Sequence, residues 1–392
     1  MVKRITLIIN VIIISLLLLT GCDKKVRSSD FTAEQLDCFD YDVEKYTTPF
    51  WEGNIVYNEC VYPLMNDKNE LIPFELMYYA DEIVSVKDPY LQKTYVKGID
   101  YKLKDGKLVI IPGGNILYEP QEYIHPDSNP YNYGSRYMIS HKDGQGFEFC
   151  NDTGLFEHGL YVTYIHNDSW TLPIPESMSE RLINTFKKLE SGQDFNVVLT
   201  GDSISVGYNS SRIMAKPPYA EGYALMAINA LRDKYDCNIK FINSAVGGST
   251  ASFTKEQLDK DILRYNPSLV IMAYGMNDGS QNVSADEYKN NINGRIKYVK
   301  ENLPDCEVLL VTSYIGNPWV FDKELYMEQA SKLYEIVDEW DGVGICDPQS
   351  IQLALMEEKG KEFISFMGDN FVHPNDYGMR IMAQCVIAAL TE

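Results

Sequence analysis

Four short motifs in the second half of the sequence contain residue types that acyl transfer uses, and the first offers a nucleophile. Gly201-Asp202-Ser203 comes directly after the apolar run 195–200. A serine at a tight turn after a strand can expose its hydroxyl for attack, and glycine leaves room there. Taken alone, the tripeptide equally fits a turn in which Asp202 or Ser203 caps the next helix.

Two further motifs offer hydrogen-bond donors. The stretch 245–250 contains two adjacent glycines after the predicted strand 239–242, and their N–H groups could approach a bound atom. The stretch 275–278 follows the predicted strand 269–273 and contains Asn277, whose side-chain amide is a good donor to an oxyanion. By itself, each motif also fits a loop with turn and capping residues.

His373 supplies an imidazole to the same region. The sequence has five His, and the other four precede residue 170. His373 lies in the segment 369–375, directly before the last predicted helix. A lone His is usually structural, but a serine, a base and two oxyanion donors together make up the groups of a serine hydrolase.

Alternating strands and helices must position these groups. Predicted strands from residue 195 onward are 195–200, 239–242, 269–273, 308–312 and 343–345, and predicted helices are 220–234, 285–302, 323–338 and 377–390. This alternation predicts an α/β fold with a parallel sheet between two helical layers. Ligands in such folds bind beyond the carboxyl ends of the strands, which is where the motifs fall.

The combined pattern resembles the SGNH/GDSL hydrolase family, which has a GDS block, a glycine block, a GxND block and a final DxxHP block. The resemblance covers about residues 195–390 and implies a carboxylic ester hydrolase. It implies Ser203 as nucleophile, His373 as general base, and Gly248 and Asn277 as oxyanion donors. Gly248 is preferred to Gly247 because the family's glycine precedes a small polar pair, here residues 249–250.

No metal or cofactor is expected. The sequence contains no GxxxxGK[ST], HExxH or EF-hand pattern, and the chemistry of a serine esterase needs neither a metal nor a cofactor.

One departure from the family pattern concerns the acid of the triad. The family places Asp three residues before the His, where this sequence has Asn370, and Asp369 lies one residue earlier. A backbone shift could bring Asp369 to His373, Asn370 could orient the imidazole, or a main-chain carbonyl could do so. We favour Asn370 or a carbonyl, because the spacing before His-Pro is otherwise intact.

The sequence pattern of the first half of the chain predicts β-strands. Short runs rich in β-branched and aromatic residues, such as 55–57, 71–78, 83–86 and 160–164, predict a β-sandwich or jelly roll over residues 31–170. Asp105-Gly106 predicts a hairpin turn. A connector over 171–194, helical at 176–191, would lead to the hydrolase domain at 195–392, and the length allows two separate cores.

A targeting segment begins the sequence. Residues 1–21 combine two basic residues with an apolar run, and Leu-Thr-Gly-Cys22 resembles the lipobox of bacterial lipoproteins. Lipidation of Cys22 would place the protein in the cell envelope, extracytoplasmic and membrane-anchored, on a short tether at 22–30. Of the other cysteines, Cys306, Cys346 and Cys385 lie in apolar runs and are predicted core residues.

The net charge and the domain architecture limit the classes of binding partner and substrate that we expect. The net charge of −21 disfavours nucleic-acid binding. A sandwich before an SGNH domain resembles two-domain bacterial carbohydrate esterases, which implies an acylated, mainly O-acetylated, polysaccharide as substrate. A lipase or lysophospholipase on the same fold is one alternative. A non-catalytic glycan-binding surface lipoprotein is the other, and the Asn at position 370 is its best support.

Overall fold

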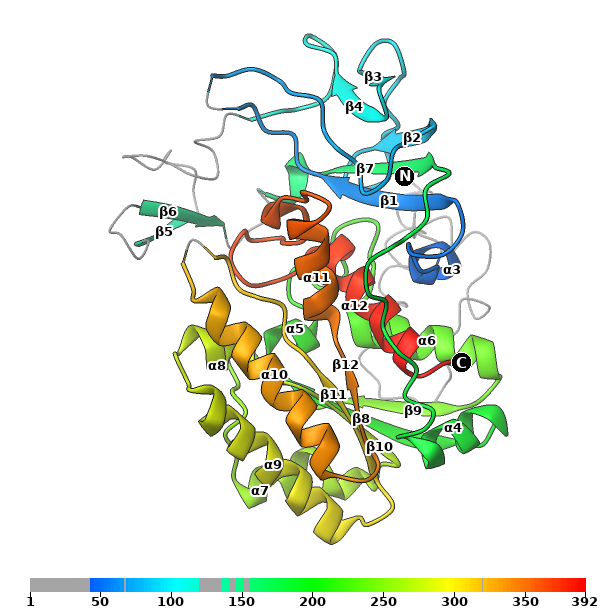
Figure 1. Ribbon diagram of the computed structural model, residues 1–392, viewed down its shortest axis with the longest axis vertical. Coiled ribbons are helices and arrows are strands. Elements are labelled where there is room, and N and C mark those ends of the chain that lie inside the picture. The colour runs from blue at the N-terminus through cyan, green and yellow to red at the C-terminus, as the bar shows by residue number, and fades with distance from the viewer. Residues whose placement is uncertain (1–42, 67, 120–135, 141–145, 151–154, 319) are drawn as a thin grey trace, which may run out of the picture.

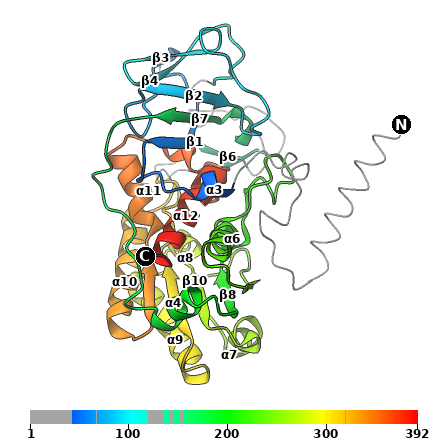
Figure 2. The same ribbon diagram turned by 90° about the vertical axis from the view of Figure 1, so that its right-hand side faces the viewer.

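The computed structural model describes residues 43–66, 68–119, 136–140, 146–150, 155–318 and 320–392 (Figures 1 and 2). The predicted signal segment 1–21, Cys22 and the tether 22–30 lie outside the described residues. Within the described ranges, no helix is both long and apolar enough to cross a membrane.

A five-stranded parallel sheet forms the centre of the C-terminal part, in the order β12-β11-β10-β8-β9. The strands are β8 (Phe195–Gly201), β9 (Ile239–Asn243), β10 (Leu269–Ala273), β11 (Glu307–Val311) and β12 (Val343–Cys346). The central strands read as nearly continuous apolar runs because helices cover both faces of the sheet. The sequence predicted each of these strands to within two residues at either end.

Helices cover this sheet in two layers (Figures 1 and 2). On one side, α6 (Tyr223–Tyr235) packs against α12 (Asp376–Ala389), and on the other, α9 (Ala285–Asn302) packs against α10 (Lys323–Glu339). The α/β prediction is therefore confirmed. Shorter elements are α5 (Ser203–Val206), α7 (Lys255–Asp261), η4 (Leu263–Tyr265), α8 (Met276–Ser280), α11 (Pro348–Glu357) and η5 (Phe363–Ser365).

Local sequence explains where the helices begin. Ser284 caps α9 by accepting from the Glu287 N–H, and Asn375 caps α12 by accepting from the Gly378 N–H. The helix predicted at 176–191 is shorter in the structure, where α4 covers Ile183–Glu190. No helix was predicted at α11, which begins with Asp347 as cap and proline at its first position.

The N-terminal part is β-rich but is not confirmed as a jelly roll. A three-stranded antiparallel sheet has the order β1 (Ile55–Val61), β7 (Leu160–Ile165), β2 (Glu82–Lys87). Two antiparallel hairpins accompany this sheet: β3 (Tyr101–Lys104) pairs with β4 (Lys107–Ile110), and β5 (Arg136–Ser140) pairs with β6 (Gly146–Cys150). The same part contains the short helices α3 (Val43–Thr47) and η3 (Phe156–His158). The stretch predicted as a strand at 71–78 forms only isolated bridges.

The predicted turn between β3 and β4 is confirmed. Asp105 and Gly106 have φ angles of 53° and 73°, the two positive values that a type I′ turn requires. A side chain at position 106 would collide with the Tyr79 ring, which lies 2.4 Å from the position a Cβ would take. Glycine is therefore needed here for both conformation and space.

The length of the chain allows two separate cores, but its two parts share one hydrophobic cluster. Buried residues of β1, β2 and β7 belong to the same hydrophobic cluster as the parallel sheet and its helices. Polar contacts join the parts as well: Arg380 of α12 donates to the Tyr57 carbonyl of β1 at 2.5 Å, and Gln384 donates to the Thr48 carbonyl at 2.6 Å. Cys306, Cys346 and Cys385 are buried free thiols, as predicted, and so is Cys60.

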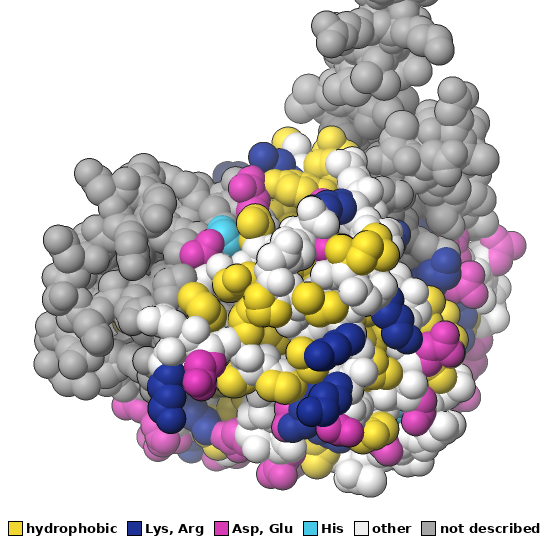
Figure 3. Space-filling view, turned by 90° about the horizontal axis from the view of Figure 1, so that it is seen from above, with side chains coloured by type: hydrophobic (Ala, Val, Ile, Leu, Met, Phe, Trp, Pro, Cys, Tyr) yellow, Lys and Arg dark blue, Asp and Glu magenta, His cyan; other side chains and the backbone are white. Residues whose placement is uncertain are grey.

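Acidic side chains are distributed rather than gathered on the face above the N-terminal sheet. Figure 3 shows this face, where basic, acidic and hydrophobic side chains are interspersed. Among the described residues visible on this face, the large negative charge of the chain therefore forms no single-sign patch.

A buried ion pair joins the N-terminal sheet to the segment that leads to His373. Glu59 of β1 is fully buried and pairs with Lys361, whose side chain is 4% exposed. The same carboxylate also accepts from the Met77 N–H at 3.0 Å and the Tyr164 hydroxyl at 2.6 Å. A buried pair with this many partners holds two distant chain segments in one register.

We expect Lys361→Ala to lower the free energy of unfolding by about 3–5 kcal/mol, because it leaves the Glu59 charge buried and uncompensated. Lys323→Ala is the matched control, since Lys323 forms an ion pair with Glu357 at side-chain exposures of 30% and 52% and should change stability by less than about 1 kcal/mol. Urea unfolding measures both. Equal losses in the two variants would contradict a special role for the Glu59–Lys361 pair.

Candidate active site

Ser203 lies at the carboxyl end of β8, at the first residue of the short helix α5. Asp202 caps this helix by accepting from the Ile204 N–H at 2.9 Å. Gly201 precedes it in a crowded position, because a Cβ there would lie 2.5 Å from both the Ala273 carbonyl oxygen and the Ser205 hydroxyl. The GDS motif thus gives a turn that only glycine can begin and that presents the Ser203 hydroxyl.

The strand order places this turn at a crevice. From β8 the chain passes through α6 to β9 on one side, and from β10 it passes through α9 to β11 on the other. Loops that leave neighbouring strands in opposite directions open a crevice at their carboxyl ends, where ligands bind in this class of fold. Ser203 follows β8 and Asn277 follows β10, so both lie at this point.

His373 joins Ser203 across the crevice. Its Nε2 atom lies 2.8 Å from the Ser203 Oγ, and its Nδ1 atom lies 2.6 Å from the Asp369 Oδ2. Nδ1–H donates to the carboxylate when Nε2 accepts from the hydroxyl, which is the arrangement in which imidazole can act as a general base. The three residues form the hydrogen-bonded chain of a serine hydrolase.

Asp369 is held by the loop that it helps to fold. Its Oδ1 atom accepts from three successive backbone N–H groups, those of Phe371, Val372 and His373, at 2.9, 3.0 and 3.1 Å. The side chain is fully buried. The three donors orient the carboxylate and stabilise its negative charge, which leaves Oδ2 directed at the imidazole.

The preference for Asn370 or a main-chain carbonyl as the partner of His373 is not what the structure shows. Asn370 has a φ of +54°, in the left-handed region that Asn tolerates better than most residues. This extra left-handed residue turns the chain so that Asp369, four residues before the His, reaches Nδ1. The Asn370 carbonyl accepts instead from the Asn317 side chain at 2.8 Å.

The two predicted oxyanion donors lie on neighbouring loops. Gly248 has a φ of +80°, so the turn there requires glycine. Asn277 Nδ2 donates one hydrogen to the Ser249 carbonyl at 2.9 Å, which leaves its second N–H for another acceptor. Gly247 is the glycine beside the nucleophile, because a Cβ on it would lie 3.7 Å from the Ser203 Cβ.

Tyr208 is a neighbour of the site that no sequence motif indicated. Its ring centre lies 5.6 Å from that of His373, and 43% of the residue is exposed. Its N–H donates to the Ser203 carbonyl at 3.0 Å, so it belongs to the same turn as the nucleophile. Its position five residues after Ser203 is the only sequence signal, and such a signal is weak.

Two buried carboxyl groups lie behind the site. Burial raises the pKa of Asp202 to about 7 and that of Asp278 to about 6, against an ordinary value of 3.8. His373 and backbone N–H groups act in the opposite direction on Asp202. Neither carboxyl hydrogen-bonds to His373, so Asp369 is the carboxylate that accepts from the imidazole.

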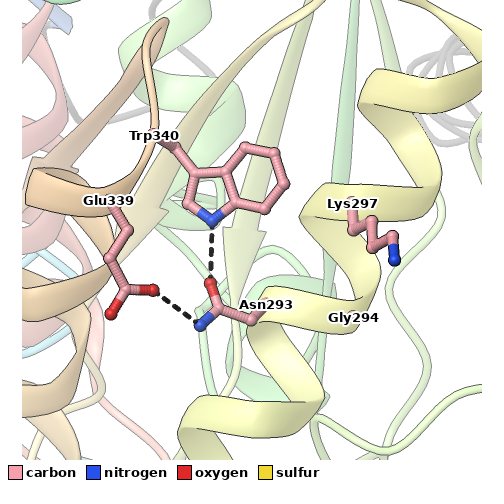
Figure 4. A pocket seen from close by; sticks show the side chains of 5 residues that line it. All are labelled: Asn293, Gly294, Lys297, Glu339 and Trp340. Carbon is pink, nitrogen blue, oxygen red and sulfur yellow. Dashed lines mark hydrogen bonds between the residues drawn. The ribbon is translucent and has the colours of Figure 1, made fainter.

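A surface hollow of about 330 Å³ lies elsewhere, between α9 and the end of α10 (Figure 4). Trp340 at its edge donates from its indole nitrogen to Asn293 at 2.9 Å. Trp340 precedes β12, so the hollow lies toward the amino ends of the strands, on the opposite side from Ser203. Among the described residues, no cluster of His, Cys, Asp or Glu could hold a metal ion.

The fold and the Ser–His–Asp chain define a carboxylic ester hydrolase of the serine type. Residues 199–381 match the GDSL-like Lipase/Acylhydrolase family, so this part of the chain is a GDSL-like lipase/acylhydrolase domain. A search of curated proteins finds no match.

Several solved structures resemble the chain distantly. A two-domain esterase (CEX) active on acetylated mannans is 22% identical, over 54% of this chain and 53% of its own, with a TM-score of 0.42. A putative GDSL-like lipase from Parabacteroides merdae is 20% identical over 50% and 95%, with a TM-score of 0.41. Axe2, an acetylxylan esterase from Geobacillus stearothermophilus, is 19% identical over 49% and 92%, with a TM-score of 0.39. The chain thus spans about half the length of the two-domain esterase, and similarity at this level does not define a substrate.

The geometry around His373 predicts different effects of substitutions at Asp369 and at Asn370. Asp369→Asn should lower kcat by about 10⁴-fold, because an amide can stabilise the wrong imidazole tautomer. Asn370→Gly should keep kcat within about threefold, since glycine adopts a positive φ, whereas Asn370→Val should lower it strongly. Hydrolysis of p-nitrophenyl acetate measures all three. If Asn370→Gly loses as much activity as Asp369→Asn, the Asn370 side chain and not its backbone conformation is what matters.

Proposed function

We propose that the protein hydrolyses O-acyl esters through a covalent acyl-enzyme on Ser203. The observation that carries this proposal is the 2.8 Å contact between the Ser203 Oγ and the His373 Nε2, with Asp369 on the other ring nitrogen. A base at this distance can take the hydroxyl proton as the oxygen attacks.

The reaction follows from this arrangement. His373 accepts the proton of Ser203, and the Ser203 Oγ forms a bond to the ester carbonyl carbon, whose oxygen becomes the oxyanion. The Ser203 and Gly248 N–H groups and the free N–H of Asn277 stabilise that charge. Collapse releases the alcohol, which takes the proton from His373. Water, activated by His373, then attacks the acyl-enzyme and releases the carboxylic acid.

The assignment of Ser203 as nucleophile and Asn277 as oxyanion donor predicts two decreases in kcat of different size. Ser203→Ala should lower kcat by about 10⁵–10⁶-fold, and Asn277→Ala by about 10²–10³-fold, because the latter removes one oxyanion donor. Both are measured with p-nitrophenyl acetate, with circular dichroism as the check of folding. A Ser203→Ala protein that retains the parent rate would exclude Ser203, and a parent without any esterase activity would favour a non-catalytic glycan binder.

We propose an O-acetylated polysaccharide as the substrate. The site opens at the surface: Val246 is 53% exposed and Tyr208 is 43% exposed, and Gly247 and Gly248 are exposed too. An open site admits an ester carried on a bulky polymer, and a half-exposed tyrosine combines an apolar face for a sugar ring with a polar hydroxyl. The sequence resemblance to two-domain carbohydrate esterases supports the same class.

An acyl-chain series separates this substrate from a lipid ester. For p-nitrophenyl esters from acetate to decanoate, kcat/KM should be highest for acetate and fall with chain length, and acetate should be released from acetylated xylan or mannan. A maximum at octanoate or decanoate, with no release from either polysaccharide, would favour the lipase or lysophospholipase alternative.

We also propose that the mature protein is anchored in the cell envelope through lipid on Cys22, on the basis of the lipobox pattern alone. Lipid chains hold a protein at a membrane through burial of hydrocarbon. Cys22→Ser should move the expressed protein from the membrane fraction to the soluble fraction, with an unchanged kcat on p-nitrophenyl acetate. Equal membrane association of both proteins would contradict the anchor.

A further inference from the structure

The loop that carries Gly248 has no regular structure of its own. It covers residues 244–254, between β9 and α7. Its first half is tied to the nucleophile strand, because the Val246 N–H donates to the Gly201 carbonyl at 3.0 Å. Its second half must be held by other parts of the molecule if the Gly248 N–H is to keep one direction.

Side chains from α8 and α9 hold this second half. Both carboxylate oxygens of Asp278 accept from the Ala251 N–H, at 3.0 and 3.1 Å. Arg295 Nε donates to the Ala251 carbonyl at 2.7 Å, and its Nη2 donates to the Ser252 carbonyl at 2.7 Å. One loop residue, Ala251, is thus bound at both of its main-chain polar groups.

The position of Arg295 is unusual for a charged side chain. The residue is 1% exposed, and its guanidinium lies 4.2 Å from the centre of the Tyr274 ring and 5.5 Å from that of Phe253. Burying a guanidinium costs free energy unless its donors are satisfied. Its Nε and Nη2 atoms donate to carbonyls of the loop, so the interactions that offset this cost include the ones that hold the loop.

Asp278 binds the same loop as Arg295 does, and it directly follows Asn277 in the sequence. Asn277 itself donates to the Ser249 carbonyl at 2.9 Å. Residues 277 and 278 therefore present one oxyanion donor and at the same time bind the loop that presents the other. The relative position of the two donors depends on these contacts.

From this arrangement we infer that Arg295 and Asp278 are positioning residues, which keep the Gly248 N–H and the Asn277 amide directed at a common oxyanion. The inference rests on the proposed function of Ser203. Neither residue lies where it would touch substrate. Their loss would loosen the loop, and preorganised donors lose their effect on the transition state when they can move.

The expected effect on kcat and KM follows from the step of the reaction at which the oxyanion forms. The oxyanion exists in the transition state and not in the bound ester, so a loosened loop should lower kcat with little change in KM. Arg295→Met fills similar space without donors. We expect its kcat for p-nitrophenyl acetate to fall about 10–100-fold, with KM within about threefold of the parent.

A transition-state analogue supplies a readout that a purely structural role would not change. Ser203 adds to 1,1,1-trifluoroacetone to form a hemiketal whose former carbonyl oxygen occupies the oxyanion position, while His373 takes the serine proton. The inhibition constant of this ketone should rise in Arg295→Met by about the factor by which kcat/KM falls.

Arg232→Met is the matched control. Arg232 is another buried arginine, and its Nε donates to the Ile239 carbonyl at 3.0 Å, at the amino end of β9 and away from the crevice. It should lower the melting temperature but leave kcat and the inhibition constant at the parent values. If Arg295→Met changes only the melting temperature, as this control does, the inference is wrong.

A second pair of variants covers the case in which Arg295→Met does not fold. Asp278→Asn keeps an oxygen that accepts from the Ala251 N–H and should lower kcat less than fivefold, whereas Asp278→Ala should lower it at least tenfold. Equal activity of the two folded variants would overturn the inference. A parent that neither hydrolyses the ester nor binds the ketone would instead overturn the proposed function.

Discussion

The carboxylate of Asp369 is the interaction on which the site depends. One oxygen gathers three backbone N–H groups of its own loop, and the other meets the imidazole of His373. The same side chain therefore folds the loop and sets the direction of the base. A single buried group therefore performs both tasks, and loss of its side chain would affect the loop and the base together.

The parallel sheet turns this local arrangement into an active site. Neighbouring strands β8 and β10 end together, since Gly201 pairs with Ala273, and their loops leave in opposite directions. The crevice between them receives Ser203 from one strand and Asn277 from the other, and the segment before α12 brings in His373. Each group sits at the end of a rigid element, which restricts the geometry of the transition state to one small volume.

The N-terminal sheet is part of the same body. It shares the hydrophobic cluster of the hydrolase domain, and Glu59 of β1 is buried against Lys361, eight residues before Asp369. The segment that leads to the acid and the base is thus tied to β1 through this buried ion pair. This arrangement gives the sheet a structural role in holding the segment that leads to the site.

The sequence by itself determined the parallel α/β fold, the five strands of its sheet, and Ser203 and His373 as candidate site residues, because apolar periodicity and motifs after strands are local properties of the chain. Only the tertiary structure decided that Asp369 and not Asn370 faces the imidazole, since this depends on one left-handed residue that spacing does not reveal. It also decided that the two halves share one core. Arg295 left a trace in the sequence, a charge in the apolar stripe of α9 with Ile292 and Val299, but its partners lie more than forty residues away in the Gly248 loop. Contacts between distant segments arise when the helices pack on the sheet, and no local pattern encodes them.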